Sequence, residues 1–303
     1  MGTQTVIAFL IIAHTEPALL RRLVRTLDAS WVRFFVHIDK KVEIRPFQDA
    51  LSDVPNATLV ENRVSVYWGG WSQVQATLNL IQEAVDSNEY FHRFALLSGS
   101  CYPVKSNVAL RDFLLADDSE RIDAVRMPNM EIHKPLSRLT KWYFEGGHRV
   151  PGLKAWGIQL ANIIAALGPT RNLAEGLGDF VPYAGSQWWV VSNAAIRIIL
   201  RTIHERPNLT ALYRNSKIPD ESFFQTIIAN SSLSSRITES LTFADWSRPQ
   251  ERPCLIDEGH LAMLLDPGTN GSDLFGSPPI FFARKFSSRN ADLLDKIDAA
   301  LRP

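Results

Sequence analysis

Two short segments in the C-terminal third of the chain hold residue types that could catalyse group transfer. The first reads IPDESFFQT and contains the adjacent carboxylates Asp220 and Glu221. The second reads IFFARKF and places Arg284 and Lys285 inside an aromatic run. A carboxylate can act as a general base, and a fixed cation can neutralise a phosphate leaving group. Together the segments indicate an inverting sugar transfer from a nucleotide donor.

Each segment also has a purely structural interpretation. Pro219 suits the first turn of a helix, where the helix dipole favours acidic residues, so Asp220 and Glu221 could be capping residues. The same positive helix end would keep a base ionised. Strand alternation would send Arg284 and Lys285 to opposite faces, one into a cleft and one to solvent, or both could snorkel at a strand end. On spacing alone, both interpretations stay open.

Alternating strand and helix patterns must position these segments. We expect strands at residues 6–13, 34–39, 94–97 and 187–191, and helices at 17–27, 71–85, 108–115, 194–203, from Pro219 onward and at 290–301. The apolar first run is typical of a strand that is buried on both faces. This order predicts an α/β fold with a doubly wound, mostly parallel sheet flanked by helices.

The ends of the predicted strands mark the expected ligand cleft, because open α/β sheets bind ligands at the carboxyl ends of their strands. That rule places His37, Asp39 and the Ser98-Gly99-Ser100 turn near its mouth. His37 and Asp39 share a strand face and could begin a metal site, but no further ligand cluster accompanies them. Contact with the base or ribose of a donor is the favoured interpretation.

The middle of the chain, residues 127–183, is less regular than the rest. It has five prolines and several aromatic residues, including Trp142. We interpret it as a helical and loop insertion over the cleft. No internal repeat or linker divides the sequence, so we expect a single domain over residues 1–303.

Composition excludes several classes of protein. The 303 residues carry 32 Lys and Arg against 32 Asp and Glu, and a nucleic-acid scaffold normally shows a basic excess. The two cysteines, Cys101 and Cys254, are few for a secreted protein of this size. The N-terminal apolar run is too short to span a membrane and lacks a basic segment before it. We therefore expect a reducing cytoplasm, with peripheral attachment to the inner membrane face as one arrangement.

Motifs of other enzyme classes are missing. Many metal-dependent sugar transferases place Asp-x-Asp at the end of a central strand, where this chain reads LSGSCYP with no carboxylate. The chain also lacks G-x-G-x-x-G, a Walker loop and G-x-S-x-G. A dehydrogenase, a P-loop enzyme and an α/β-hydrolase are thereby disfavoured.

Six blocks in order resemble the core-2/I-branching β-1,6-N-acetylglucosaminyltransferase and peptide O-xylosyltransferase family. They are HIDKK at His37, YWGGWSQVQATL from Tyr67, LLSGSCYPVKSN from Leu96, GSQWWVVS from Gly185, PDESFFQTIIANS from Pro219 and FFARKF from Phe281. The blocks cover nearly the whole chain. The last two are more similar to the xylosyltransferase branch.

The resemblance implies a GT-A fold, a UDP-sugar donor and inverting transfer without a metal ion or other cofactor. It assigns the catalytic base to Glu221 and the donor diphosphate to Lys285 and Arg284. It implies a further arginine upstream, placed at Arg252 with Arg248 as the alternative. It also places Asp39, with His37 beside it, near the nucleotide.

Two departures from the family limit what can be transferred. The animal enzymes are anchored Golgi proteins with several disulfides, so this chain resembles a soluble bacterial-type relative and their acceptors do not carry over. Cys101 stands where relatives often have an acidic residue, which leaves acceptor recognition open.

The resulting prediction is a metal-independent, inverting glycosyltransferase that moves a xylose- or N-acetylglucosamine-class sugar from a UDP-sugar to a glycan, lipid-linked or peptide hydroxyl. The candidate sugar and acceptor contacts are Trp188, Trp189, Trp142, Ser72 and Asp220. A catalytically silent carbohydrate- or nucleotide-binding module is one alternative. A metal-dependent transferase that uses Asp39 is the other.

Overall fold

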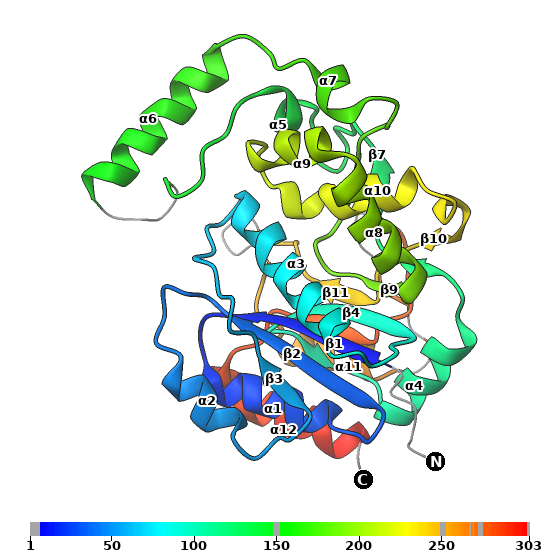
Figure 1. Ribbon diagram of the computed structural model, residues 1–303. Helices are drawn as coiled ribbons and strands as arrows, with labels where there is room; N and C mark the ends of the chain where they lie inside the picture. The colour runs from blue at the N-terminus through cyan, green and yellow to red at the C-terminus, as the bar shows by residue number, and fades with distance from the viewer. Residues whose placement is uncertain are drawn as a thin grey trace.

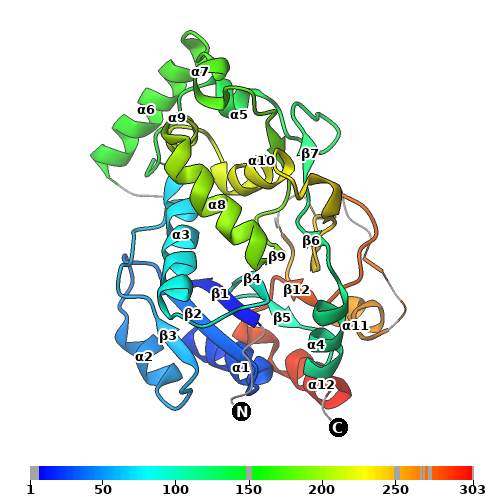
Figure 2. The ribbon, with the colours of Figure 1, turned by 45° about the vertical axis from the view of Figure 1, so that its right-hand side comes forward.

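The described part of the chain folds around one seven-stranded sheet, as a computed structural model shows (Figure 1). This structure describes residues 7–147, 152–248, 253–266, 268, 270–271 and 275–301. Helices cover both faces of the sheet, and a further group of helices stands beyond one of its edges (Figures 1 and 2).

The seven strands lie in the order β10-β6-β9-β4-β1-β2-β3. Their bounds are β10 (Ile237–Thr238), β6 (Glu120–Arg121), β9 (Val190–Ser192), β4 (Arg93–Ser98), β1 (Ile7–Ala13), β2 (Val32–Ile38) and β3 (Ala57–Leu59). Only β9 runs antiparallel to its neighbours. The expected α/β fold with a mostly parallel sheet is therefore confirmed.

The register of the central strands brings their polar ends together. Ile12 of β1 lies opposite both His37 of β2 and Ser98 of β4. The residues that follow these strands therefore meet at one edge of the sheet, as parallel pairing requires.

Two hydrophobic layers cover the faces of the sheet. Phe9 and Ile11 of β1 pack into one layer with α1 (Pro17–Leu27) and α12 (Ala291–Leu301), while Ala8 and Leu10 pack into the other with α3 (Trp71–Asp86) and α8 (Asn193–Glu205). Strand alternation explains this division. Further helices and 3-10 turns in this part of the protein are α2 (Arg45–Leu51), α4 (Asn107–Ala116), η2 (Ser234–Arg236), α11 (Glu258–Leu265) and η3 (Ser288–Asn290).

A second, three-stranded sheet carries the FFARKF block. Strand β12 (Phe282–Arg284) lies between β11 (Thr242–Ala244) and β5 (Tyr102–Pro103). Because β5 follows β4 after a short turn, this small sheet lies beside the main sheet (Figure 2). Lys285 thus comes directly after a strand and not inside one.

The region from 127 to 183 lies away from the sheet together with α9 (Pro207–Arg214) (Figure 1). Its described elements are α5 (Ser137–Thr140), α6 (Leu153–Leu167), α7 (Leu173–Leu177) and β8 (Tyr183–Ala184), which pairs with β7 (Val125–Arg126). Its status as an insertion within a single domain stays a prediction.

Two local predictions were wrong. The helix expected from Pro219 is split into a 3-10 turn, η1 (Pro219–Glu221), and α10 (Phe223–Ala229), because Ser222 leaves helical geometry at φ −147°. Asp220 and Glu221 therefore lie on a single short turn and gain little from a helix dipole. The strand expected at 187–191 begins only at Val190.

Both cysteines are free and buried. Among the described residues, no helix combines the length and apolar character needed to cross a membrane.

Candidate functional site

The Glu221 carboxylate is anchored through one oxygen. Its Oε2 accepts hydrogen bonds from Lys134 Nζ at 2.5 Å and from Arg138 Nη1 at 2.7 Å. No described residue donates to Oε1, and 25 % of the side chain is exposed. One oxygen thus fixes the orientation of the carboxylate, and the other can receive a proton.

Glycine at 185 allows this anchoring. Gly185 N donates to the carbonyl of Glu221 at 2.8 Å, and Gly185 O accepts from Lys134 Nζ at 2.8 Å. A Cβ at this position would lie 1.7 Å from the carbonyl oxygen of Asp123. Only glycine lets the backbone at position 185 pass this close to Asp123.

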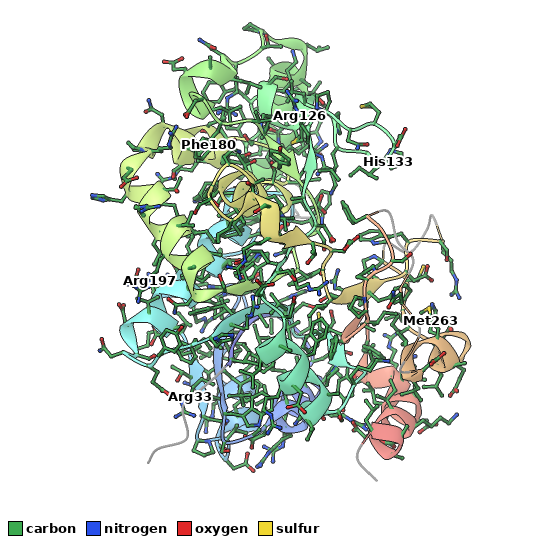
Figure 3. The ribbon with its side chains drawn as sticks, turned by 90° about the vertical axis from the view of Figure 1, so that its right-hand side faces the viewer. Arg33, Arg126, His133, Phe180, Arg197 and Met263 are labelled. Carbon is green, nitrogen blue, oxygen red and sulfur yellow. The ribbon has the colours of Figure 1, made fainter. Side chains whose placement is uncertain are left out.

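The second anchoring residue, Arg138, belongs to α5. Its Nη2 donates to the carbonyl of His133, which has a left-handed φ of 57° and ends a tight turn closed by Asn129 and Lys134. His133 points outward at the edge of the molecule (Figure 3), whereas the next residue, Lys134, is buried. The turn therefore sends Lys134 inward to Glu221.

The ion pairs, and not the helix end, control the ionisation of Glu221. Burial raises the pKa of Glu221, but the charges of Lys134 and Arg138 outweigh burial and hold it below its usual value. Burial also lowers the pKa of Lys134, against the pull of Glu221. Glu221 is therefore a carboxylate at neutral pH, the state that a general base requires.

Asp220 lies beside Glu221 in a different environment. Its Oδ2 accepts from Gln73 Nε2 at 3.2 Å, and the same nitrogen lies 3.3 Å from Gln187 Oε1. Its Oδ1 is buried with no hydrogen-bond partner among the described residues. Burial, reinforced by the charge of Glu221, raises the pKa of Asp220 to about 7.

The start of α3 is capped by a residue distant in sequence. Glu145 Oε2 accepts from the backbone N of Ser72 at 2.9 Å and from its Oγ at 2.8 Å. Ser72 Oγ in turn accepts from Tyr67 N. A Cβ on Gly70 would lie 2.1 Å from Glu145 Oε2, so the glycine admits the carboxylate. The Ser72 hydroxyl is therefore engaged within the protein.

Arg284 lies against an aromatic ring. Its guanidinium carbon lies 4.7 Å from the centre of the Trp188 ring. Burial lowers the pKa of Arg284. Its Nε is buried without a partner, and no carboxylate of the described residues forms an ion pair with it.

Lys285 is exposed near the ends of the central strands. Burial lowers the pKa of His14, which follows β1, and the charges of Lys41 and Lys285 lower it further while Asp39 opposes them. Lys285 is therefore close to the edge where β1 and β2 end. Among the described residues, Lys285 forms no ion pair.

Asp39 and His37 serve the loops that follow β2. Asp39 Oδ1 accepts from the backbone N of Lys41 at 2.9 Å and of Val66 at 3.3 Å. His37 is fully buried, accepts from Val64 N through Nε2, and has a pKa lowered to about 4 by burial. The structure thus describes His37 as a neutral core residue, and contact between its side chain and a donor is not supported.

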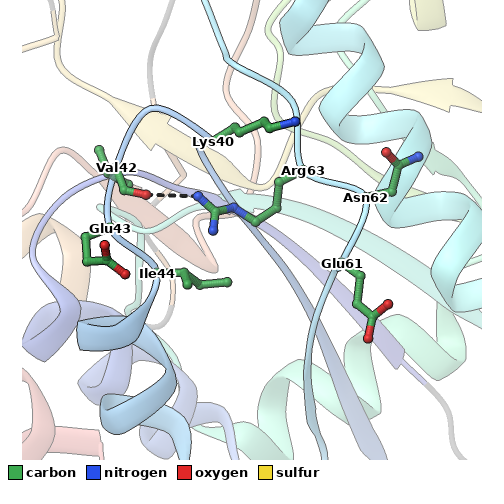
Figure 4. A pocket seen from close by; sticks show the side chains of 7 residues that line it. All are labelled: Lys40, Val42, Glu43, Ile44, Glu61, Asn62 and Arg63. Carbon is green, nitrogen blue, oxygen red and sulfur yellow. Dashed lines mark hydrogen bonds between the residues drawn. The ribbon is translucent and has the colours of Figure 1, made fainter.

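A cavity of about 410 Å³ lies beside these loops (Figure 4). Arg63 holds its shape, since its guanidinium donates to the carbonyls of Ile38, Asp39 and Val42. The other lining residues are Lys40, Glu43, Ile44, Glu61 and Asn62. A smaller cavity of about 290 Å³ lies beside Arg138 and is lined by Met130, His133, Pro135, Ser137, Lys217 and Ile218.

The three candidate tryptophans differ in access. Trp189 is 1 % exposed and packs against Phe224, so it belongs to the core and stacking on a sugar is not supported. Trp188 is 7 % exposed under Arg284. Trp142 is 46 % exposed, with the Arg171 guanidinium over its ring.

The two candidates for the upstream arginine have different outcomes. Arg252 lies outside the described residues. Arg248 is exposed and forms an ion pair with Asp257 at 2.9 Å.

The GSQWW segment connects the carboxylate side of the site to the cationic side. Gly185 binds Glu221, Gln187 binds Gln73 next to Asp220, and Trp188 lies under Arg284. Three residues of extended chain span at most about 11 Å. The segment therefore contacts the base candidate at one end and Arg284 at the other.

Sequence reasoning missed several residues of this region. These residues reach the site from positions that are remote in sequence, so no local pattern marks them. They are Lys134, Arg138, Gln73 and Glu145. His14 could have been found by the rule that ligands bind at strand ends. Among the described residues, no group of three or more His, Cys, Asp and Glu side chains could hold a metal ion.

The chain is similar in sequence to a family of known proteins. The family model described as Core-2/I-Branching enzyme matches residues 7–264. Xylosyltransferase oxt of Drosophila melanogaster is 26 % identical over 241 residues, which cover 78 % of this chain and 26 % of that protein. Xylosyltransferase 2 of Rattus norvegicus is 25 % identical over 316 residues, which cover 98 % of this chain and 34 % of that protein.

The chain thus spans about a third or less of the length of these relatives. Among solved structures, it is similar to the apo form of mouse xyloside xylosyltransferase 1, at 10 % identity and a TM-score of 0.35, over 92 % of this chain and 97 % of that one.

Proposed function

The chain belongs to the Core-2/I-branching enzyme family, and from this membership we propose that it is an inverting, metal-independent glycosyltransferase of GT-A type. It would transfer a xylose- or N-acetylglucosamine-class sugar from a UDP-sugar to a hydroxyl group. The names of the xylosyltransferase relatives support this donor class. The acceptor would be a glycan, a lipid-linked glycan or a peptide.

One observation carries the proposal: Glu221 is an ionised carboxylate with one oxygen anchored and one open. In the proposed step, the acceptor oxygen attacks the anomeric carbon as its proton passes to Glu221 Oε1. The bond from the anomeric carbon to the donor phosphate breaks, and UDP leaves with the electron pair. The anchors on Oε2 keep the carboxylate aimed at the acceptor, which is a large part of what positioning contributes.

Charge that develops on the diphosphate needs fixed cations in the same region. Arg284 and Lys285 form no ion pair with any carboxylate of the described residues, and the segment that contacts Glu221 at Gly185 contacts Arg284 at Trp188. We assign the diphosphate contact to these two side chains. Lys134 and Arg138 are unsuited to this role because both are bound to Glu221 Oε2.

Asp39 receives no support as a metal ligand. Two backbone amides occupy its Oδ1, and Lys41 Nζ lies 3.2 Å from its Oδ2. These bonds give Asp39 a loop-shaping role, and the region it shapes adjoins the 410 Å³ cavity beside the strand ends. We propose that the nucleotide base binds on this side of the site.

The direct test is Glu221→Gln, assayed by UDP release over a panel of UDP-sugars and acceptors. We expect a loss of about 10³-fold in turnover, within the range for removing a general base. Glu205→Gln, an exposed carboxylate at the end of α8, is the matched control and should be fully active. Retained turnover in Glu221→Gln would remove Glu221 as the base.

Metal independence is tested in the same assay. Turnover should be unchanged when EDTA is added to the wild-type enzyme. Loss of turnover with EDTA, restored by a divalent cation, would contradict this part of the proposal and leave the role of Glu221 intact.

A further inference from the structure

Helix α6 is attached to the protein by its polar side. Asn162 makes two hydrogen bonds to the backbone of Phe144, at 2.8 and 2.9 Å, and Gln159 Nε2 donates to the carbonyl of Gly147. At the end of the helix, Lys141 Nζ donates to the carbonyl of Gly168 at 2.6 Å. These bonds hold α6 against the segment from 141 to 147.

Helix α6 lies at the periphery of the molecule (Figures 1 and 2), and its apolar side is exposed. Six large apolar residues of this helix are between 47 and 93 % exposed: Leu153, Trp156, Leu160, Ile163, Ile164 and Leu167. Their spacing places them within roughly 100° of the helix circumference, along a helix about 22 Å long. This is the reverse of an ordinary surface helix, which turns its apolar stripe to the core. A continuous exposed stripe of this kind marks a binding surface.

The charges around the stripe are of one sign. No Asp or Glu occurs in the sequence between Glu145 and Glu175, whereas Lys154 lies in this stretch. Lys154 is exposed on the helix itself, and the Glu145 carboxylate is turned inward to Ser72. The surface therefore combines apolar side chains with positive charge.

The stripe contains a tryptophan. Trp156 is 69 % exposed. Tryptophan is enriched where proteins meet the interface of a bilayer, because its ring is both apolar and able to donate a hydrogen bond. A helix with an exposed apolar stripe, a lysine and an interfacial tryptophan fits a membrane surface.

We propose that α6 docks this protein on a bilayer that contains anionic phospholipids. The helix would lie in the plane of the interface with its stripe among the acyl chains. A second copy of the chain is a poorer occupant, since a two-fold contact would place the same positive surface against itself. The segment beneath α6 also supplies Glu145 to the start of α3, so docking would hold the candidate site beside the bilayer.

Vesicle flotation tests this proposal with the chain as it stands. We expect binding to vesicles of phosphatidylcholine with about 30 % phosphatidylglycerol, and weaker binding to pure phosphatidylcholine or at high salt. Ile163→Gln/Ile164→Gln should lower the bound fraction about tenfold or more, because two apolar side chains are lost from the stripe. Val108→Gln/Leu115→Gln, two exposed apolar residues of α4, should bind as wild type does.

Equal melting temperatures would show that the α6 variant is folded. Absence of wild-type binding to the anionic vesicles, or binding unchanged in the α6 variant, would overturn the proposal. A concentration-dependent dimer that the α6 variant abolishes, without vesicle binding, would assign the stripe to a second copy instead. UDP release from water-soluble acceptors should be unaffected by the α6 variant, so neither outcome depends on the proposed catalytic role.

Discussion

Two pairs of cations border the candidate site, and only one pair binds a carboxylate. Lys134 and Arg138 both bind Glu221 Oε2. Arg284 and Lys285 have no carboxylate partner among the described residues, and Arg284 Nε is buried with no hydrogen bond at all. A buried cation without a counter-charge is costly, and burial already lowers the pKa of Arg284.

This difference separates two uses of positive charge. In the proposed mechanism, the carboxylate-bound pair, Lys134 and Arg138, orients Glu221 and lowers its pKa before any substrate arrives. The open pair, Arg284 and Lys285, binds an anion that the protein does not supply, and a donor diphosphate has the matching charge. Variants of each pair should therefore fail in different ways.

The largest effect is expected at the open pair. Lys285→Ala should lower kcat/KM for the UDP-sugar by about 10²-fold, because the leaving diphosphate loses a fixed charge. Steady-state UDP release measures the effect. Lys296→Ala, an exposed lysine that pairs with Glu258 on α11, is the matched control and should behave as wild type. Equal losses in the two variants would show that Lys285 contributes only general surface charge.

A smaller effect of a different kind is expected at the carboxylate-bound pair, Lys134 and Arg138. Arg138→Gln removes one of the two charges that lower the pKa of Glu221, so this pKa should rise. The acid side of the profile of kcat/KM against pH should then move to higher pH, with about tenfold lower activity on that side. Arg206→Gln, which breaks an exposed ion pair with Asp179, should leave the profile in place. An unmoved profile in Arg138→Gln would mean that Glu221 does not control the acid limb.

The smallest effect concerns Asp220, the neighbour of Glu221, which forms no ion pair with either pair of cations. Its folded-state pKa of about 7 exceeds the ordinary value of 3.8, so between these pH values the folded protein holds a proton that the unfolded chain has released. Stability is therefore lost as the pH rises through this window. Asp220→Asn removes the loss and should be more stable than wild type at pH 8, with the advantage vanishing near pH 4. Denaturant unfolding at several pH values measures it, and an advantage independent of pH would contradict the account.

The sequence patterns predicted most of the fold because its elements are long and strongly patterned. The apolar run of β1 and the amphipathic repeat of α1 specify strand and helix almost to the residue. The helix from Pro219 failed because Ser222 breaks it to bond Tyr213 and Tyr183, and these tertiary contacts leave no local signal.

The site was predictable only in part, for a related reason. Glu221, Arg284 and Lys285 stand in recognisable blocks, whereas Lys134 and Arg138 reach Glu221 from 87 and 83 residues away along the chain. Strand alternation also could not show that Trp189 would be packed against Phe224 while Trp188 lies under Arg284. These distinctions depend on packing between segments that are remote in sequence.

The binding of UDP, measured by isothermal titration with the wild type, Glu221→Gln and Lys285→Ala, tests the contrast between the two cation pairs most directly. We expect Glu221→Gln to bind UDP within about twofold of wild type, and Lys285→Ala to bind about tenfold or more weakly, because of these two residues Lys285 alone belongs to the open pair. Full UDP affinity in Lys285→Ala, together with lost affinity in Glu221→Gln, would contradict the assignment of the open pair to the donor.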